Sequence, residues 1–247
     1  MARFIVYYNN VILSGATIIE NTISSALVEM LIHNMRGHTI LKDAKTGKCL
    51  DINAAHLEVY GLKHAHELIG STVWDVNNFM NKMWLDNAQQ VAKFDEEVLS
   101  TAQPVIKPCR VWLNSQGMVW AHHMAKYPVI NNDNKVIAIL GTSEDLTVTL
   151  ELEKLYQYYR YFYKNQKIAI AKFLQHVGIL DYFETLPTHA ELRVLITKKR
   201  FIQNKLVAFH LNITEGTLES HINRIINKLK FNSFNLNSIL LEINIRS

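Results

Sequence analysis

The pattern of apolar and polar positions changes along the chain. In residues 38–147, short runs of alternating apolar and polar side chains are separated by turn signals, which is typical of antiparallel strands. In residues 148–185, apolar positions recur at helical spacing, and helix start signals continue through residues 186–247. The pattern predicts an α+β chain with an antiparallel-sheet domain, a helical linker and an all-α four-helix domain. Residues 1–37 form a flanking segment with one predicted helix, Glu20 to Met35.

Five strands and one long helix are predicted within residues 38–147. The turns carry glycine or asparagine, and Asn53 is placed to cap a short helix. The long helix is expected from about Trp84 to Ser100. The strands are expected at residues 38–43, 48–52, 105–113, 118–126 and 136–143.

Two strands, then helices, then three strands resemble the arrangement of the PAS family. Short motifs of that family also occur: Asp43 with Gly47, Leu50–Asn53, Tyr60–Gly61, Glu67–Gly70 and Glu144–Thr147. The resemblance implies a domain that senses a small molecule, a redox cofactor or light, or that mediates dimerisation.

Side chains on the inward faces of the last three strands are candidates for lining a ligand pocket, although they would equally fill a core. They are Val111, Leu113, Trp120, Met124, Ile137 and Ile139. His122 and His123 are adjacent on one strand, so one of them should point inward.

The cofactor is unknown, and flavin and haem are disfavoured. Cys109 precedes Arg110 on a predicted strand, whereas flavin photosensors of the PAS family carry their reactive cysteine on a helix. The predicted long helix contains no histidine for a haem iron. No spacing of histidine, cysteine and carboxylate side chains indicates a metal site.

The linker has a heptad pattern. Its seam positions step by alternating intervals of four and three residues, and all but the polar Gln166 are apolar: Val148, Leu152, Leu155, Tyr159, Phe162, Gln166, Ala169 and Phe173. We expect a coiled-coil seam of a parallel dimer; the alternative is that the same stripe packs inside its own chain.

Three helices are predicted in residues 186–230. Thr188 and Glu191 form a capping-box pattern at the start of the first. The second contains Val207 and Ala208, and Thr214 is the expected N-cap of the third. The third helix has one apolar face, with Leu218, Ile222, Ile225 and Leu229.

The spacing of these residues, from Val194-Leu195 through Asn204-Lys205, Val207-Ala208 and Thr217-Leu218-Glu219 to Lys228-Leu229, resembles the LuxR/GerE helix-turn-helix family without a gap. Departures are Lys199-Arg200-Phe201 and Lys230, where the family often has glycine. By resemblance, Glu219, Ser220 and Asn223 face bases in the major groove of DNA. By the same resemblance, Lys205, Thr214, Thr217, Arg224, Asn227 and Lys228 contact phosphates.

The distribution of charge also supports DNA binding by the C-terminal segment. The formal net charge is +4, and residues 186–247 contain nine Lys/Arg and four Asp/Glu, so residues 1–185 sum to −1. Phosphate contacts need such a local excess of positive charge.

The sequence indicates a cytoplasmic regulator, because Cys49 and Cys109 are too few for a disulfide scaffold, which fits a reducing compartment. No apolar run reaches the length of about 18 residues that a membrane span needs. No catalytic residue pattern or glycine-rich phosphate loop is present, so an enzyme is not expected. The expected partners are double-stranded DNA with pseudo-palindromic sites, a second copy of the chain and a small-molecule ligand. An alternative is a quorum-type regulator with an autoinducer-binding N-terminal domain.

Overall fold

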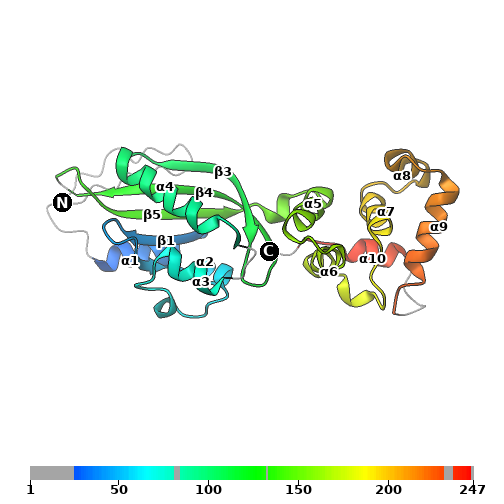
Figure 1. Cartoon of the computed structure of the whole chain (residues 1–247), viewed down its shortest axis with the longest axis horizontal. Coiled ribbons are helices and arrows are strands. Elements are labelled where there is room, and N and C mark those ends of the chain that lie inside the picture. The colour runs from blue at the N-terminus through cyan, green and yellow to red at the C-terminus, as the bar shows by residue number, and fades with distance from the viewer. Residues whose placement is uncertain (1–24, 81–83, 132, 231–235, 246–247) are drawn as a thin grey trace. The chain divides into compact units, whose positions relative to one another are not determined.

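A computed structural model of the chain describes residues 25–80, 84–131, 133–230 and 236–245. The chain divides into two compact units, with the boundary between Leu146 and Thr147 (Figure 1). Of the predicted flanking segment, residues 1–24 lie outside the described residues. The described part begins with helix α1 (Ser25–Asn34), which corresponds to the second half of the expected helix.

The first unit is built on a five-stranded antiparallel sheet in the order β2-β1-β5-β4-β3. Strand β5 lies in the centre and pairs with β1 and β4, so the first and last strands of the unit are neighbours. Its strands are β1 (His38–Asp43), β2 (Cys49–Ile52), β3 (Val105–Leu113), β4 (Val119–Ile130) and β5 (Val136–Asp145). Helices α2 (Ala54–Tyr60), α3 (Val73–Phe79) and α4 (Asn87–Thr101) connect β2 to β3. The predicted α+β class and order of strands are confirmed.

Local signals set several of these bounds. The side chain of Asn53 accepts a hydrogen bond from the backbone N–H of His56 at 3.1 Å and caps α2, as predicted. Gly47 and Gly117 have φ of 67° and 71°, a left-handed conformation that glycine adopts without a steric penalty, in two of the predicted turns.

The two faces of the sheet pack against different helices. On one face, Trp112 and Trp120 belong to a core that includes Leu57 of α2 and Val76 of α3. Helix α4 covers the same face further along, where its Val98 and Phe94 pack with Val105 and Ile139. The opposite face packs against α1 through a small cluster: Ile32, Val129, Ala138 and Leu140.

Strand β4 is longer than the sequence predicted, since it continues past Lys126 to Ile130 and passes through Pro128. The pairing of β4 with β3 ends at Lys126, whereas its pairing with β5 continues. Pro128 therefore lies beyond the pairing with β3, on a stretch of β4 that pairs with β5, and proline is tolerated in a sheet at such edge positions.

The second unit is all-α. Its helices are α5 (Leu152–Phe162), α6 (Gln166–His176), α7 (His189–Arg200), α8 (Asn204–Leu211), α9 (Glu215–Ile226) and α10 (Leu236–Glu242). The predicted capping box at Thr188 is present, because its side chain accepts from the N–H of Glu191 while the Glu191 carboxylate accepts from the N–H of Thr188. An antiparallel bridge between Phe183 and Leu229 ties the segment before α7 to the end of α9.

The expected continuous coiled-coil helix is wrong. The helix is interrupted between Phe162 and Gln166, where α5 ends and Asn165 caps the start of α6. Most of the heptad seam is buried inside the unit: Leu155, Tyr159, Phe162, Ala169 and Phe173. The Tyr159 hydroxyl is also hydrogen-bonded to Nδ1 of the buried His176 at 2.6 Å. The apolar stripe therefore forms the core between α5, α6 and α7, which was the alternative interpretation.

Candidate functional site

Helices α8 and α9 form a helix-turn-helix. Asn212 ends α8 in the left-handed conformation, with φ of 55°, and the N–H of Ile213 donates to the carbonyl of Ala208 at 3.0 Å. Thr214 then caps α9, because its Oγ accepts from the N–H of Thr217 at 3.1 Å. Ala208 is buried, which permits close approach of the two helices at the turn.

Helix α9 divides into a buried and an exposed side. Leu218 and Ile225 are fully buried, and Leu229 just beyond the helix is buried as well. Eight of the nine residues predicted to contact DNA are exposed: Lys205, Thr214, Thr217, Glu219, Ser220, Asn223, Arg224 and Asn227. Seven of them lie on α9 or at its two caps. These seven residues lie along the exposed side of α9, which we call the α9 face, whereas Lys205 lies on α8.

The first turn of α9 has little bulk. Gly216 has open space at the position of a Cβ, and Thr214 and Thr217 share a hydrogen bond between their hydroxyls at 2.9 Å. Ser220 Oγ donates to the Gly216 carbonyl at 3.0 Å. Small polar groups at a helix N-terminus leave room for another backbone or a phosphate to approach its N–H groups.

Lys228 differs from the other predicted phosphate contacts. Its Nζ lies 2.7 Å from a carboxylate oxygen of Glu191 and donates to the Leu186 carbonyl at 3.4 Å. The Lys228 side chain is 22% exposed and that of Glu191 only 3%. Burial raises the pKa of Glu191, but hydrogen bonds from Lys228 and Thr188 outweigh this and lower it. Lys228 thus connects the segment after α9 to the first turn of α7, and its ammonium group does not extend from the surface.

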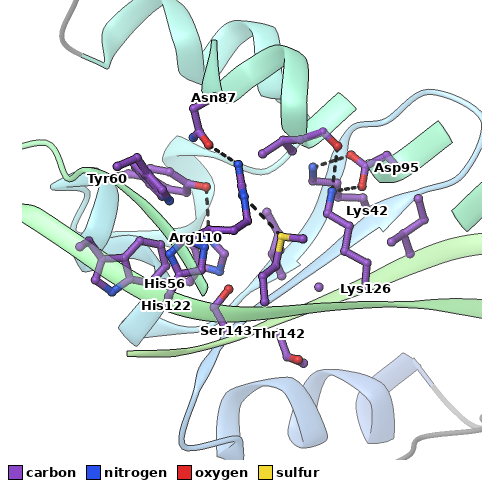
Figure 2. A pocket seen from close by; sticks show the side chains of 17 residues that line it. Lys42, His56, Tyr60, Asn87, Asp95, Arg110, His122, Lys126, Thr142 and Ser143 are labelled. Carbon is purple, nitrogen blue, oxygen red and sulfur yellow. Dashed lines mark hydrogen bonds and ion pairs between the residues drawn. The ribbon is translucent and has the colours of Figure 1, made fainter. Parts of the chain in front are cut away.

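The first unit contains a cavity on the face of the sheet that α2 and α4 cover, with a free volume of about 50 Å³ (Figure 2). Alternation along the strands selects its lining. From β4 come Trp120, His122, Met124 and Lys126, and β3 adds Arg110 and Trp112. The expectation that one of His122 and His123 points inward is confirmed for His122.

Three of the six predicted pocket residues line this cavity: Trp120, Met124 and Ile139. The other three predicted pocket residues do not line the cavity, so these predictions are wrong. Ile137 is 41% exposed near the start of β5, and Val111 and Leu113 do not line the cavity. On β3 the positions that line it are Arg110 and Trp112, after a shift of register against β4 between Lys107 and Arg110. That irregularity cannot be read from alternation alone.

The polar side chains of the cavity were missed by the search for apolar positions. Lys42 and Lys126 share the carboxylate of Asp95, with Lys42 Nζ 2.9 Å from one oxygen and Lys126 bonded to the other. Lys126 also donates to the Val91 carbonyl at 3.0 Å. Burial, together with the neighbouring Lys42 ammonium, lowers the pKa of Lys126 to about 7. Burial raises the pKa of Asp95, but the two ammonium groups outweigh that effect and lower it.

Arg110 occupies the middle of the cavity in Figure 2, where its guanidinium donates to Asn87 Oδ1 at 2.6 Å and to Gln90 Oε1 at 3.3 Å. Burial lowers its pKa to about 10, and no carboxylate within the described residues forms an ion pair with it. Burial also lowers the pKa of His56 to about 3, so this imidazole is neutral at physiological pH. A lysine or arginine on a strand gives no sequence signal of this arrangement, because the same residues are common on exposed strand faces.

Other kinds of site find no support in the described residues. No group of three or more His, Cys, Asp or Glu side chains there is arranged to hold a metal ion. None of the helices in the described part of the chain is long and apolar enough to cross a membrane.

Several solved structures resemble the chain. A Vibrio cholerae VqmA–ligand–DNA complex has 20% identity and a TM-score of 0.43, over 86% of this chain and 83% of that one. A phage VqmA–DPO complex has 19% identity and a TM-score of 0.44, over 87% and 85% of the two chains. The PAS domain of Bordetella pertussis BvgS has 19% identity and a TM-score of 0.44, over 55% and 94%. With TM-scores below 0.5, the fold assignment rests on the sheet topology and on the family comparison below.

Among curated proteins, a diguanylate cyclase from Vibrio cholerae is 27% identical over 134 residues. These residues are 53% of this chain but only 39% of the length of that relative. The cyclase activity therefore belongs to that protein and is not transferred by the match.

Residues 38–151 match the sequence model of the PAS fold family. The matched range contains all five strands in the order described above, together with the cavity. The antiparallel-sheet unit of this chain is thus a PAS domain, followed in sequence by an all-α unit with a helix-turn-helix.

Proposed function

We propose that the chain is a DNA-binding transcriptional regulator in which the PAS domain responds to a small molecule and controls the helix-turn-helix. The observation that carries the proposal is the α9 face, because one helix exposes short polar side chains outward while its apolar side is fixed in a core. A helix of this kind fits the width of the major groove, with its N-terminal residues at the base edges.

Base readout is assigned to Glu219, Ser220 and Asn223. The amide of Asn223 can pair bidentately with adenine, and the Glu219 carboxylate can accept from cytosine N4. Both side chains are exposed and lie on the same helix.

Phosphate contacts are assigned to Lys205 on α8 and to Thr214, Thr217, Arg224 and Asn227 on the α9 face. Lys228 is left out of this set because Glu191 engages its ammonium group.

The PAS cavity is the proposed signal site, with no assigned flavin or haem. We further propose that the protein acts in the cytoplasm as a homodimer on pseudo-palindromic sites, because helix-turn-helix modules commonly bind two half-sites. Because the apolar stripe of α5 and α6 is buried within its own unit, we propose that the dimer contact uses other surfaces. Sedimentation of the purified chain with and without DNA would test it, and a monomer on DNA would contradict the dimer.

The experiment measures binding to a duplex that the protein itself selects from a random library, and to an unrelated duplex, over a range of salt concentrations. Asn223→Ala and Ser220→Ala should each weaken binding to the selected duplex by about 1–3 kcal/mol and leave the unrelated duplex nearly unchanged. Arg224→Ala should weaken both and reduce the salt slope by about one.

Lys164→Ala is the matched control, because Lys164 is exposed but lies between α5 and α6 and not on the α9 face. Equal losses on both duplexes for Asn223→Ala would contradict base readout. The absence of any selected duplex would contradict sequence-specific regulation as a whole.

A further inference from the structure

Positive charge exceeds negative charge around the PAS cavity, where Lys42 and Lys126 are buried and Arg110 and Asp95 are partly buried. Lys42, Lys126 and Arg110 line it, whereas Asp95 is the one carboxylate among the described residues that line it. Figure 2 shows the Lys42–Asp95–Lys126 cluster and the Arg110 guanidinium beside the same space. The lining therefore carries more cationic than anionic side chains. Buried charge without a partner is costly, and a bound anion would remove that cost.

Hydrogen-bond donors are also in excess. Eight buried side-chain atoms in the described residues lack a hydrogen-bond partner, and five belong to residues that line the cavity. Three of these five atoms can only donate: Trp112 Nε1, Trp120 Nε1 and Asn87 Nδ2. Each of the three residues is at least nine-tenths buried. Asn87 Oδ1 accepts from Arg110, which fixes the amide orientation and leaves the NH₂ as the unpaired group.

Arg110 has donors to spare. Its guanidinium contacts two neutral amide oxygens and Met124 Sδ, at 3.5 Å, although a guanidinium carries five N–H groups. The exposed Asp86 lies near enough to raise its pKa but forms no ion pair with it. A planar fork of this kind matches a carboxylate, which can accept two parallel hydrogen bonds.

The size of the cavity restricts the ligand. Its free volume of about 50 Å³ is about a third of the engineered 150 Å³ cavity that takes benzene. Aromatic rings of Trp112, Trp120 and His122 form part of the wall, with Trp120 and His122 stacked at 3.9 Å between ring centres. Flat, apolar walls suit a short hydrocarbon portion attached to the anionic group.

We propose that this cavity binds a small organic carboxylate whose carboxylate group accepts from Arg110 and from the unpaired N–H donors of the lining, and whose short hydrocarbon part lies against the faces of the aromatic rings. The inference rests on the proposed function, in which the PAS cavity is the signal site, and it names the chemical class of the signal. Asn87, which is bonded to Arg110, and Lys126 also line the cavity and supply further donors.

The test compares carboxylates with their uncharged amides on the full chain. Thermal unfolding and titration calorimetry are measured with sodium acetate, sodium propionate and sodium benzoate, and with acetamide, propionamide and benzamide at equal ionic strength. Acetate and propionate should raise the unfolding temperature of the PAS unit in a saturable manner, whereas benzoate, whose ring needs a larger cavity, and the amides should not. Because this comparison uses the unaltered protein, it does not depend on whether a variant folds.

Variants then locate the site. Arg110→Gln and Lys126→Met should each weaken carboxylate binding about tenfold or more, the loss expected for one charge-assisted hydrogen bond. Lys135→Met is the matched control, because this exposed lysine lies in the turn before β5, and it should bind as the unaltered protein does.

Three results would overturn the inference. They are an equal rise with the amides, an equal rise with sodium chloride at the same ionic strength, or a response to sodium phosphate alone. DNA binding is measured on the same samples. A protein that binds its selected duplex but ignores carboxylates contradicts only the ligand class, whereas a protein that selects no duplex contradicts the proposed function, whatever the calorimetry shows.

Discussion

The ion pair between Lys228 and Glu191 gives the sharpest test of the helical unit. Replacing Lys228 with methionine keeps most of the side-chain volume and removes the ammonium group. Glu191, which is 3% exposed, would then keep the hydrogen bond from the backbone N–H of Thr188 but lose its cation. A buried carboxylate that loses its cation strongly destabilises the folded state, because its charge is left without a partner away from water.

The magnitude follows from the burial of the two partners. Removing one partner of a fully buried pair costs about 3–5 kcal/mol, and losing a hydrogen bond to a charged group costs about 1.5–3 kcal/mol. Lys228 is 22% exposed, so water reaches part of the pair and the lower range applies. We expect about 2 kcal/mol, which is a fall of about 10 °C in the melting temperature of a unit of this size.

Acid dependence gives an independent readout. The pKa of Glu191 is lowered in the folded chain, so the carboxylate contributes stability above its unfolded pKa of about 4.3 and loses it as the pH falls through the folded value. Glu191→Gln should therefore reduce the loss of stability below about pH 5.

Calorimetric melting of the unaltered chain, Lys228→Met and the control Lys230→Met would measure these effects, since Lys230 is exposed two residues away. Lys230→Met should have the same melting temperature as the unaltered chain. A Lys228→Met variant that is equally stable but binds all DNA more weakly, with a flatter salt dependence, would refute the ion-pair argument. It would restore Lys228 to the phosphate contacts that the sequence predicted.

Three further changes probe other parts of the chain. Burial lowers the pKa of Lys126, so the PAS unit should gain stability between about pH 7 and pH 10, by at most about 1.4 kcal/mol per pH unit, and Lys126→Met should abolish this slope in urea titrations. Tyr159→Phe removes the 2.6 Å hydrogen bond to His176 and should destabilise the helical unit by about 1.5 kcal/mol in the same titrations. Ala208→Leu overfills the buried turn of the helix-turn-helix, and should cost about 1–3 kcal/mol by melting and weaken DNA binding further. An unchanged slope, midpoint or affinity would contradict the respective argument.

Local signals made the helix-turn-helix predictable from the sequence. Thr188 with Glu191, and Thr214 before α9, are caps whose side chains satisfy free N–H groups within three residues, so the geometry is contained in the sequence itself. The exposed residues of α9 followed because helical periodicity fixes which positions face the core.

Contacts between distant segments were not predictable in the same way. Lys228 was assigned to the surface because nothing near it in sequence shows that Glu191, on α7, lies beside it. Leu155 and Tyr159 fit a dimer seam and a monomer core equally well, since heptad spacing records burial but not the partner. Trp112 lines the cavity in place of Val111 because a register shift in β3 moves the inward positions.

The division after Leu146 has a consequence for how such a chain can be rebuilt. The backbone N–H of Leu146 donates to the carbonyl of Ala121, so the last residue of the first unit is still tied to the sheet. Helices α5 and α6 share their core with α7. A fusion point at residue 147 would therefore keep both hydrophobic cores intact. A fusion point at residue 186 would remove α5 and α6, which pack against α7. Sensor exchange between regulators of this build should succeed at the first position and fail at the second.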